Sequence, residues 1–150
     1  MNVEIRSVTS DDWQFILDIR NEKEVRDASL NDEIISKETH QKYMKKLEER
    51  TTNVYQRIIL YNKQTVGYVK VVDEEISYMI MKEFRGKGIG SQFFVIVFKE
   101  LKELGITKIR ASIRIDNVSS LNLGQKMGYK YTGIISKNNK PFAYKVEKKL

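Results

Sequence analysis

The chain has 150 residues, of which 41% are hydrophobic and 31% charged, as expected for one soluble globular domain spanning residues 1–150. It has no cysteine and one histidine, which excludes a disulfide framework, a thiolate nucleophile and the usual zinc ligand sets, so we expect no metal. The net charge of +7 does not by itself indicate a nucleic-acid partner, because most lysines are interleaved with glutamates, a pattern typical of solvated helix faces.

Two further classes of protein are disfavoured. A nucleic-acid-binding module needs exposed aromatic side chains among clustered basic residues, whereas the aromatic residues here fall mostly on apolar faces. No apolar run approaches the roughly 20 residues of a membrane-spanning helix, and the first residues lack the basic-then-apolar pattern of a signal peptide. We therefore expect a cytoplasmic protein without a nucleic-acid or membrane partner.

Apolar periodicity predicts an α/β (α+β) domain with the element order β-α-α-β-β-β-α-β-α-β-β. The expected strands cover residues 3–8, 54–61, 66–72, 76–81, 106–115, 129–136 and 142–146. The expected helices cover residues 10–21, 36–50, 89–104 and 117–127, with Ser10 or Asp11 capping the first and Ser36 capping the second. Residues 25–31 are polar and without periodicity, so we expect an irregular segment there.

Three glycines, Gly86, Gly88 and Gly90, lie between an expected strand and an expected helix. Glycine lets the backbone take positive φ and approach a phosphate, while a helix N-terminus adds unpaired N–H donors and partial positive charge. Arg85 and Lys87 add formal charge. The segment therefore indicates a polyanionic ligand, with a tight turn carrying solvated basic residues as the alternative. Its spacing fits neither a Walker loop nor a dinucleotide-binding fingerprint.

The segment 85–90 resembles the signature of the GNAT superfamily of N-acetyltransferases, Arg/Gln-x-x-Gly-x-Gly/Ala, whose fixed positions are matched by Arg85, Gly88 and Gly90. The segment 117–129 is similar to the second motif of that superfamily, which has an Asn, a short helix and then a Gly-Tyr or Gly-Phe pair. The resemblance covers almost the whole chain, because the expected element order is also that of the superfamily. It implies a single-domain GNAT fold with a mixed central sheet, acetyl-CoA as co-substrate and a small-molecule amine as partner; we also expect a monomer or homodimer.

By this resemblance, the contacts with acetyl-CoA fall on three segments. The strand before the loop would lie along the pantetheine arm through Tyr78, Met79 and Ile80, at a place where two parallel strands splay apart. The loop and the first turn of the next helix would bind the pyrophosphate, and the helix of the second motif would meet the pantetheine arm from the other side. The residues implied in these two segments are Arg85, Gly86, Lys87, Gly88, Ile89, Gly90, Ser91, Asn117 and Ser120.

Direct attack of an amine on a thioester needs a base, an N–H donor for the oxyanion and near-attack placement, and it benefits from a proton donor for the departing thiolate. Many relatives carry a tyrosine seven residues past the motif Asn, where this chain has Gly124. The acid is therefore open among Tyr78, Ser120, Tyr129 and a bound water, and we take Tyr78 as the candidate. Relatives often carry a carboxylate at the start of the fourth strand, where this chain has Glu74 and Glu75. We take Glu75 as the candidate base, and for either residue the alternative is a solvated turn residue. A chain without the usual tyrosine could also be an acyl-CoA-binding regulator that does not catalyse.

The expected first two helices contain Arg20, Asn21 and His40 within an Arg-Asn and then an Ile-Ser-x-Glu-x-His pattern. This pattern resembles acetyltransferases that act on amino sugars carried by nucleotides in bacterial flagellin-glycan and related surface-sugar pathways. In the family these helices flank the acceptor site, so the resemblance implies that the three residues contact the acceptor. Ribosomal-protein acetyltransferases share parts of the pattern, so a protein N-terminus or lysine, and a small amine or antibiotic, stay open as acceptors. The alternative for the residues themselves is that Arg20 packs against the core while His40 faces water.

Overall fold

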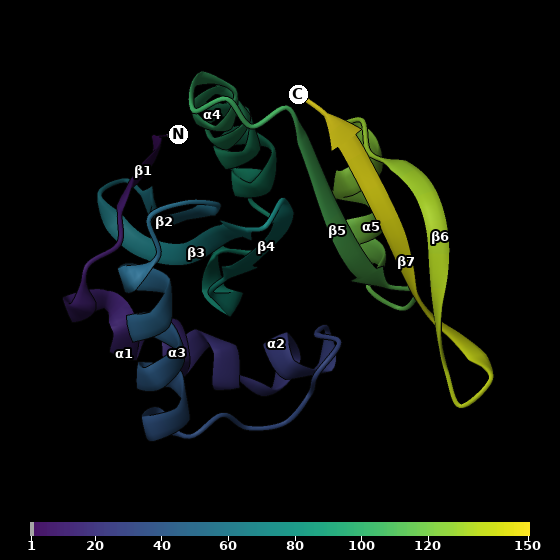
Figure 1. Ribbon diagram of the computed structural model, residues 1–150, viewed down its shortest axis with the longest axis horizontal. Helices are drawn as coiled ribbons and strands as arrows, with labels where there is room; N and C mark the ends of the chain where they lie inside the picture. The colour runs from purple at the N-terminus through teal and green to yellow at the C-terminus, as the bar shows by residue number, and fades with distance from the viewer. Residues whose placement is uncertain (1) are drawn as a thin grey trace.

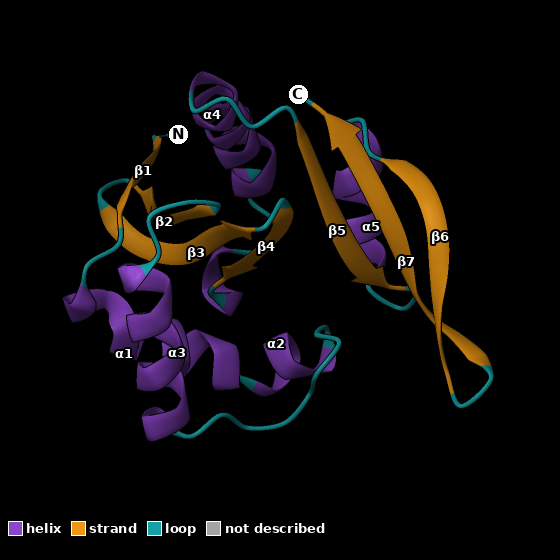
Figure 2. Ribbon diagram, in the orientation of Figure 1, coloured by secondary structure: helices purple, strands orange, loops and turns teal. Residues whose placement is uncertain are grey.

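The strands form one seven-stranded sheet in the computed structural model, which describes residues 2–150 (Figures 1 and 2). They are β1 (Val3–Ser7), β2 (Val54–Tyr61), β3 (Gln64–Val72), β4 (Glu75–Ile80), β5 (Lys108–Arg114), β6 (Lys130–Lys137) and β7 (Lys140–Lys149). Their order across the sheet is β1-β2-β3-β4-β5-β7-β6. All neighbouring strands are antiparallel except β4 and β5, which are parallel, so the sheet is mixed.

Helices cover both faces of the sheet. They are α1 (Trp13–Asn21), α2 (Lys23–Asp27), α3 (Lys37–Glu49), α4 (Ile89–Glu103) and α5 (Val118–Lys126), with short 3-10 turns η1 (Ser10–Asp12) and η2 (Lys82–Phe84). In Figure 1, α1, α2 and α3 lie on one side of the sheet and α4 on the other, while α5 lies against β5 and β7. Neighbouring β2 residues show why both faces are apolar: Ile59 packs in the cluster that contains α4, and Ile58 packs in the cluster that contains α1 and α3. Successive side chains of a strand point to opposite faces, so a sheet covered on both faces buries both sets, and both isoleucines are fully buried.

The two parallel strands meet at a single point and then diverge. Glu75 and Arg110 are the one pair in register between β4 and β5, next to a hydrogen bond of 2.8 Å from the backbone N–H of Arg110 to the carbonyl of Glu74. Figure 1 shows β5 turning away from β4 beyond this point. The expected splay is therefore confirmed, and it leaves the second half of β4 without a strand on that side.

The expected fold class and element order are confirmed, with one difference at α2. The segment 25–31, expected to be irregular, begins inside this short helix, because buried Val25 anchors a turn that otherwise has only polar side chains. The cap expected at Ser36 is present, since its Oγ accepts a hydrogen bond of 3.1 Å from the backbone N–H of Thr39. The first helix begins as η1, so neither Ser10 nor Asp11 caps an α-helix directly.

Within residues 2–150, the structure contains no helix with both the length and the apolar composition that a membrane crossing requires.

Candidate functional site

A cavity of about 540 Å³ lies where the splayed strands, the glycine-rich segment and the first three helices meet. Its lining includes Tyr78, Met79 and Ile80 from β4, together with side chains of α1, α2, α3 and α5. Its size is in the range of small-molecule and cofactor sites. The cavity therefore joins the region expected to bind acetyl-CoA to the region expected to bind the acceptor.

The glycine-rich segment adopts a backbone that glycine takes without strain and most other residues do not. Gly86 and Gly88 have φ of 73° and 77°, in the left-handed region. Gly88 is the N-cap of α4, so the N–H groups of the first turn, from Ile89 to Ser91, have no partner within the helix. Such groups, with the positive end of the helix dipole, favour a phosphate.

Gly90 is required for a different reason, the close packing of α4 on α5. A Cβ at Gly90 would lie 2.8 Å from Cδ2 of Leu123, closer than side chains pack. This approach brings the end of α5 to the start of α4, where Nζ of Lys126 donates a hydrogen bond of 3.0 Å to Oγ of Ser91. The arrangement therefore places a further cation, Lys126, beside the predicted phosphate site.

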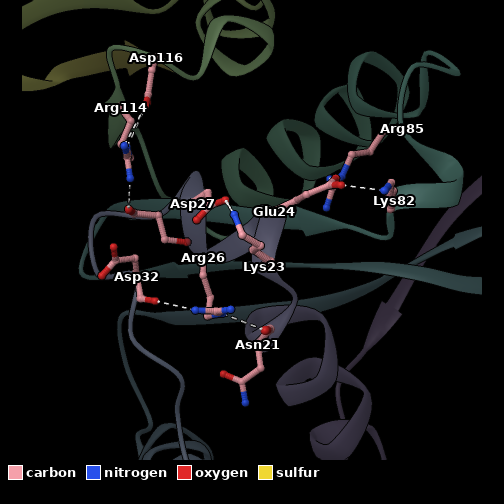
Figure 3. Close-up of polar contacts among 11 residues, drawn as sticks. Asn21, Lys23, Glu24, Arg26, Asp27, Asp32, Lys82, Arg85, Arg114 and Asp116 are labelled. Atoms are coloured by element: carbon pink, nitrogen blue, oxygen red, sulfur yellow. Dashed lines mark hydrogen bonds and ion pairs between the residues drawn. The ribbon is translucent and has the colours of Figure 1, made fainter.

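The guanidinium of Arg85 is directed to α2 (Figure 3). Its Nε donates to the carbonyl of Ile80 at 3.0 Å, and its Nη1 lies 2.8 Å from Oε2 of Glu24. Nζ of Lys82 lies 2.8 Å from the other oxygen of Glu24. Hydrogen bonding from Lys82 and the charges of both cations lower the pKa of Glu24, so this carboxylate is ionised and paired. Arg85 therefore joins the glycine-rich segment to α2.

Two hydroxyl groups meet between β4 and α5. The hydroxyl of Tyr78 lies 3.0 Å from Oγ of Ser120, one turn inside the N-terminus of α5. Asn117 caps this helix, accepting a hydrogen bond of 3.3 Å from the backbone N–H of Ser120. Burial raises the pKa of Tyr78, so its phenol is protonated at neutral pH and can donate a proton or a hydrogen bond.

The position where relatives carry a tyrosine is occupied by Gly124, which is buried beside the ring of Tyr129. A Cβ at Gly124 would lie 3.8 Å from Cδ2 of Tyr129 and 3.5 Å from Cδ1 of Ile113. The hydroxyl of Tyr129 is buried without a hydrogen-bond partner among the described residues, and Tyr129 does not line the cavity. Of the hydroxyls considered from the sequence, Tyr78 and Ser120 therefore line the cavity.

The wall of the cavity predicted to face the acceptor is formed by α1, α3 and one face of β3 and β4. Register pairs Ser77 with Lys70, and both line the cavity. Nζ of Lys70 donates a hydrogen bond of 2.7 Å to the hydroxyl of Tyr43 on α3. His40, one turn earlier on α3, is 6% exposed and lines the same wall. Burial, with a smaller contribution from the charge of Lys70, lowers the pKa of His40 below its ordinary value.

Two arginines near this wall differ in what they face (Figure 3 shows the second). Arg20 lines the cavity, and its Nη2 donates to the carbonyl of Asn31 at 2.7 Å while its Nη1 is buried without a partner among the described residues. Arg26 does not line the cavity; it donates to the carbonyls of Asn21 and Asp32 at 3.0 and 3.2 Å. Asn21 is also outside the lining, because its side-chain amide exchanges two hydrogen bonds of 2.8 Å with the backbone of Ile35.

Most residues predicted from the sequence converge on this cavity. Those that line it are Arg20, His40, Tyr78, Met79, Ile80, Arg85, Gly86, Ile89, Gly90, Asn117 and Ser120. Those that do not are Asn21, Glu75, Lys87, Gly88 and Ser91. Gly88 and Ser91 are part of the loop and helix start described above, and Lys87 is exposed on that loop. Glu75 is exposed where β4 begins, which separates it from the cavity.

Three residues that sequence reasoning did not propose belong to the site: Lys70, Tyr43 and Lys126. Alternation along the strand 66–72 indicates that Lys70 shares a face with Tyr68, which was a usable signal. The position of Lys126 depends on how α5 packs on α4, which no local pattern encodes. Among residues 2–150, no cluster of three or more carboxylate or imidazole side chains is placed to hold a metal ion.

Comparison with known proteins gives matches over almost the whole chain. A family model described as an acetyltransferase (GNAT) domain matches residues 2–130. A domain from Methanocaldococcus jannaschii DSM 2661 is 26% identical in sequence, with a TM-score of 0.83 and 99% of each chain covered. Spermidine N-acetyltransferase from Vibrio cholerae, solved in complex with CoA and spermine, is 14% identical, with a TM-score of 0.84 and 98% of this chain and 95% of that chain covered. Ribosomal-protein-alanine N-acetyltransferase from Brucella melitensis is 20% identical, with a TM-score of 0.78 and 98% and 99% covered. No curated protein sequence matches the chain.

Proposed function

The chain belongs to the GNAT acetyltransferase family and is thereby an acetyl-CoA-dependent N-acetyltransferase, and from this premise we propose that its acceptor is an amino sugar carried on a nucleotide. The observation that carries the choice of acceptor is a nitrogen of the Arg20 guanidinium that has no partner among residues 2–150, in a cavity where these residues provide no free carboxylate. The acetyl-CoA side and the acceptor side support the proposal separately.

The residues of the acetyl-CoA side fit that co-substrate. Gly86 and Gly88 expose backbone at positive φ beside the N-terminus of α4, which suits a pyrophosphate. Lys126 adds a cation there. The second half of β4 has backbone groups with no strand beside them, which suits the amides of a pantetheine arm. When bound, acetyl-CoA supplies the activated acetyl group as a thioester.

The hydroxyl pair places a proton donor beside the splayed strands. The phenol of Tyr78 is protonated, lines the cavity and is oriented by Ser120 at 3.0 Å. In this proposal it donates to the departing thiolate, in place of the tyrosine that relatives carry at the position of Gly124. The open edge of β4 provides backbone N–H groups of the kind that stabilise an oxyanion.

The charges of the cavity disfavour a polycationic acceptor. Among its described lining residues, Glu24 is the one carboxylate, and both of its oxygens are paired with Lys82 and Arg85. The lining also contains the cations Arg20 and Lys70. Spermidine or an aminoglycoside, which the structural relatives named for them acetylate, would bring several positive charges to this wall. Repulsion without a compensating carboxylate makes that class unfavourable.

An anionic acceptor suits the same wall. Nη1 of Arg20 has lost its water without gaining a hydrogen bond, a state that a phosphate oxygen of a bound ligand would relieve. The ring of Tyr43, 40% exposed, adds an aromatic surface of the kind on which a nucleotide base stacks. A diphosphate-linked amino sugar carries a base, phosphates and the amine that is to be acetylated, and so combines all three features.

The test is a panel of primary amines assayed for CoA release with a thiol reagent. The protein contributes no background to this assay, because it has no cysteine. The panel comprises a UDP-linked amino sugar, the same amino sugar without the nucleotide, spermidine, an aminoglycoside and a peptide with an N-terminal alanine. We expect kcat/KM to be highest for the UDP-linked amino sugar. A higher value for spermidine, the aminoglycoside or the peptide would refute the proposed acceptor.

Arg20 and Arg26 provide a matched pair of variants for the same assay. Both donate to carbonyls of the segment after α2, but only Arg20 lines the cavity. Loss of one charge-assisted hydrogen bond to phosphate, about 1.5–3 kcal/mol, predicts that Arg20→Gln raises KM for the UDP-linked amino sugar about tenfold to a hundredfold. Arg26→Gln should leave that KM close to the parent value. Equal effects of the two variants would mean that Arg20 acts through the fold alone.

A further inference from the structure

We propose that His40 is the general base that removes the proton from the ammonium group of the acceptor before the amine attacks the acetyl carbonyl. This inference rests on the N-acetyltransferase activity but not on the identity of the acceptor. The proton moves from the acceptor nitrogen to a ring nitrogen of His40, and the C–N bond forms as the C–S bond breaks. The departing thiolate takes the phenol proton of Tyr78. The nitrogen loses a second proton as the amide forms; this proton passes through solvent and restores Tyr78, while His40 releases its own proton to solvent.

His40 is in the cavity and its ring is free to accept a proton. The imidazole is 6% exposed and lines the wall formed by α3, β3 and β4. Within residues 2–150, no hydrogen bond engages its ring nitrogens; its backbone N–H donates to Ser36 at 3.0 Å, as in any helix. His40 therefore lines the space that the acceptor must fill, and no described protein group holds its ring nitrogens.

The carboxylate, the buried phenols and the cations of the cavity cannot take this role. The carboxylate of Glu24 is paired with two cations at 2.8 Å each. Burial raises the pKa of both Tyr68 and Tyr78, so these phenols are protonated at neutral pH. The guanidinium group of arginine and the ammonium group of lysine offer no lone pair. Glu75, the base expected from the sequence, is exposed outside the cavity.

The groups around His40 keep it in the form that a base requires. The charged groups on the same wall are Arg20 from α1 and Lys70 from β3, and the phenols are Tyr43 from α3 and Tyr68 from β3. Burial opposes a charge on the imidazole, and the positive charge of Lys70 opposes it further. The pKa of His40 therefore lies below its ordinary value near 6.5, and the neutral imidazole is present throughout the range above it.

This assignment predicts a distinctive dependence on pH. A primary amine with a pKa of roughly 9, between an α-amino group and lysine, is about 1% neutral at pH 7. An enzyme with a base uses the protonated amine, so kcat/KM of the parent should reach its plateau below pH 7, above the pKa of His40. Without the base, only the neutral amine reacts, and kcat/KM should rise tenfold per pH unit until the amine itself is deprotonated. The two profiles should meet near pH 9.

The experiment compares the parent with His40→Gln from pH 5.5 to 10, using the amine of the panel above that has the highest kcat/KM and a measured pKa. We expect a loss of about a hundredfold at pH 7 and tenfold at pH 8, and near-parent activity at pH 9, with the dissociation constant of acetyl-CoA unchanged. A loss that is equal at all pH values is the signature of a structural role and would overturn the inference. Parent-like activity of His40→Gln at pH 7 would overturn it too.

Two further measurements keep the inference testable even if the variant folds poorly. His40 is the only histidine, so in a tag-free preparation of the parent every imidazole NMR signal belongs to it. We expect its NMR titration to coincide with the acidic limb of kcat/KM; an imidazole that is cationic on the kinetic plateau would refute the proposal. Glu75→Gln is the competing variant. If kcat/KM rises tenfold per pH unit for Glu75→Gln and not for His40→Gln, the base is Glu75. If an amine other than the nucleotide-linked one is preferred, the proposed acceptor fails while this inference stands.

Discussion

Gly86 and Gly105 form a natural pair for testing whether the glycine-rich segment binds phosphate through its backbone. Their φ values are 73° and 84°, and a Cβ at either position would meet nothing within 4 Å. Alanine at each therefore adds left-handed strain of about 1–2 kcal/mol and no steric clash. Gly86→Ala and Gly105→Ala should each lower the free energy of unfolding by that amount, which corresponds to a Tm about 2–8 °C lower for a domain of this size.

Ligand binding should separate the two variants. Gly86 lines the cavity at the start of α4, whereas Gly105 lies just past the other end of that helix. If the backbone at position 86 changes to relieve this strain, its N–H groups turn away from the pyrophosphate. The loss of one charge-assisted hydrogen bond costs about 1.5–3 kcal/mol. We therefore expect Gly86→Ala to raise the dissociation constant of acetyl-CoA about tenfold to a hundredfold, and Gly105→Ala to leave it unchanged.

The assay is isothermal titration calorimetry with acetyl-CoA, together with thermal unfolding of each variant. Gly86→Asn is the rescue variant, because asparagine tolerates positive φ, as Asn53 and Asn62 do in this chain with φ of 60° and 50°. It should restore most of the affinity. If Gly86→Ala and Gly105→Ala weaken acetyl-CoA to the same extent, binding follows stability and the backbone of the segment is not the phosphate site.

Three further outcomes are expected from other parts of the structure. Asp12→Asn should lower the free energy of unfolding by about 1.5–3 kcal/mol at pH 7, because the guanidinium of Arg6 donates two hydrogen bonds of 2.8 Å to this carboxylate. Those bonds lower the pKa of Asp12 in the folded state. The stabilisation by its carboxylate is therefore complete above the pKa of the unfolded chain, near 3.9, and is lost as pH falls through the lower pKa of the folded state. In urea unfolding, the free energies of unfolding of the parent and the variant should converge below about pH 4. Gly67→Ala should lower the free energy of unfolding by about 1–3 kcal/mol, because its Cβ would lie 2.5 Å from the carbonyl oxygen of Met79. Gly133→Ala is the control: its Cβ would lie 3.7 Å from the nearest atom, so this variant should change little in the same urea titration. Acetyl-CoA binding should weaken with salt far less steeply than duplex DNA binding, which loses about 0.9 log units per neutralised phosphate per log unit of salt; tight and steeply salt-dependent DNA binding without acetyl-CoA binding would contradict the assignment.

The element order could be predicted because the apolar patterns here are strong and local. Ile109, Ala111 and Ile113 alternate along a strand, and the glycines at 86, 88 and 90 are spaced as a phosphate-binding turn requires. The helix at α2 could not be predicted, because Val25 is its one buried residue and a single apolar position has no period. Its residue Glu24 also contacts Arg85 and Lys82, about 60 positions later in the chain, which no local pattern indicates.

The site was predicted where motifs are local and missed where it depends on tertiary contacts. A helical period places His40, Met44 and Leu47 on one face, and all three are buried, so burial of the histidine was readable from the sequence. The residues that surround His40 could not be predicted from the helical period, since Lys70 reaches this wall from a strand. The expectation that Arg85 adds charge for a phosphate could not anticipate Glu24, which takes up its guanidinium from another helix.

The single pair between β4 and β5 also divides the molecule into regions of unequal resistance to local unfolding. Most fully buried apolar side chains belong to residues before 105, whereas β5, β6 and β7 contribute only Ile109, Ala143 and Val146 to the buried apolar set. Regions with few buried contacts open at lower free energy than the rest, and amide protons there exchange sooner. A ligand that bridges the gap binds only while both regions are closed, and at a hundred times its dissociation constant it adds about 2.7 kcal/mol to the cost of opening. In the proposed binding mode, acetyl-CoA lies between β4 and β5 and joins the two regions into one cooperative unit.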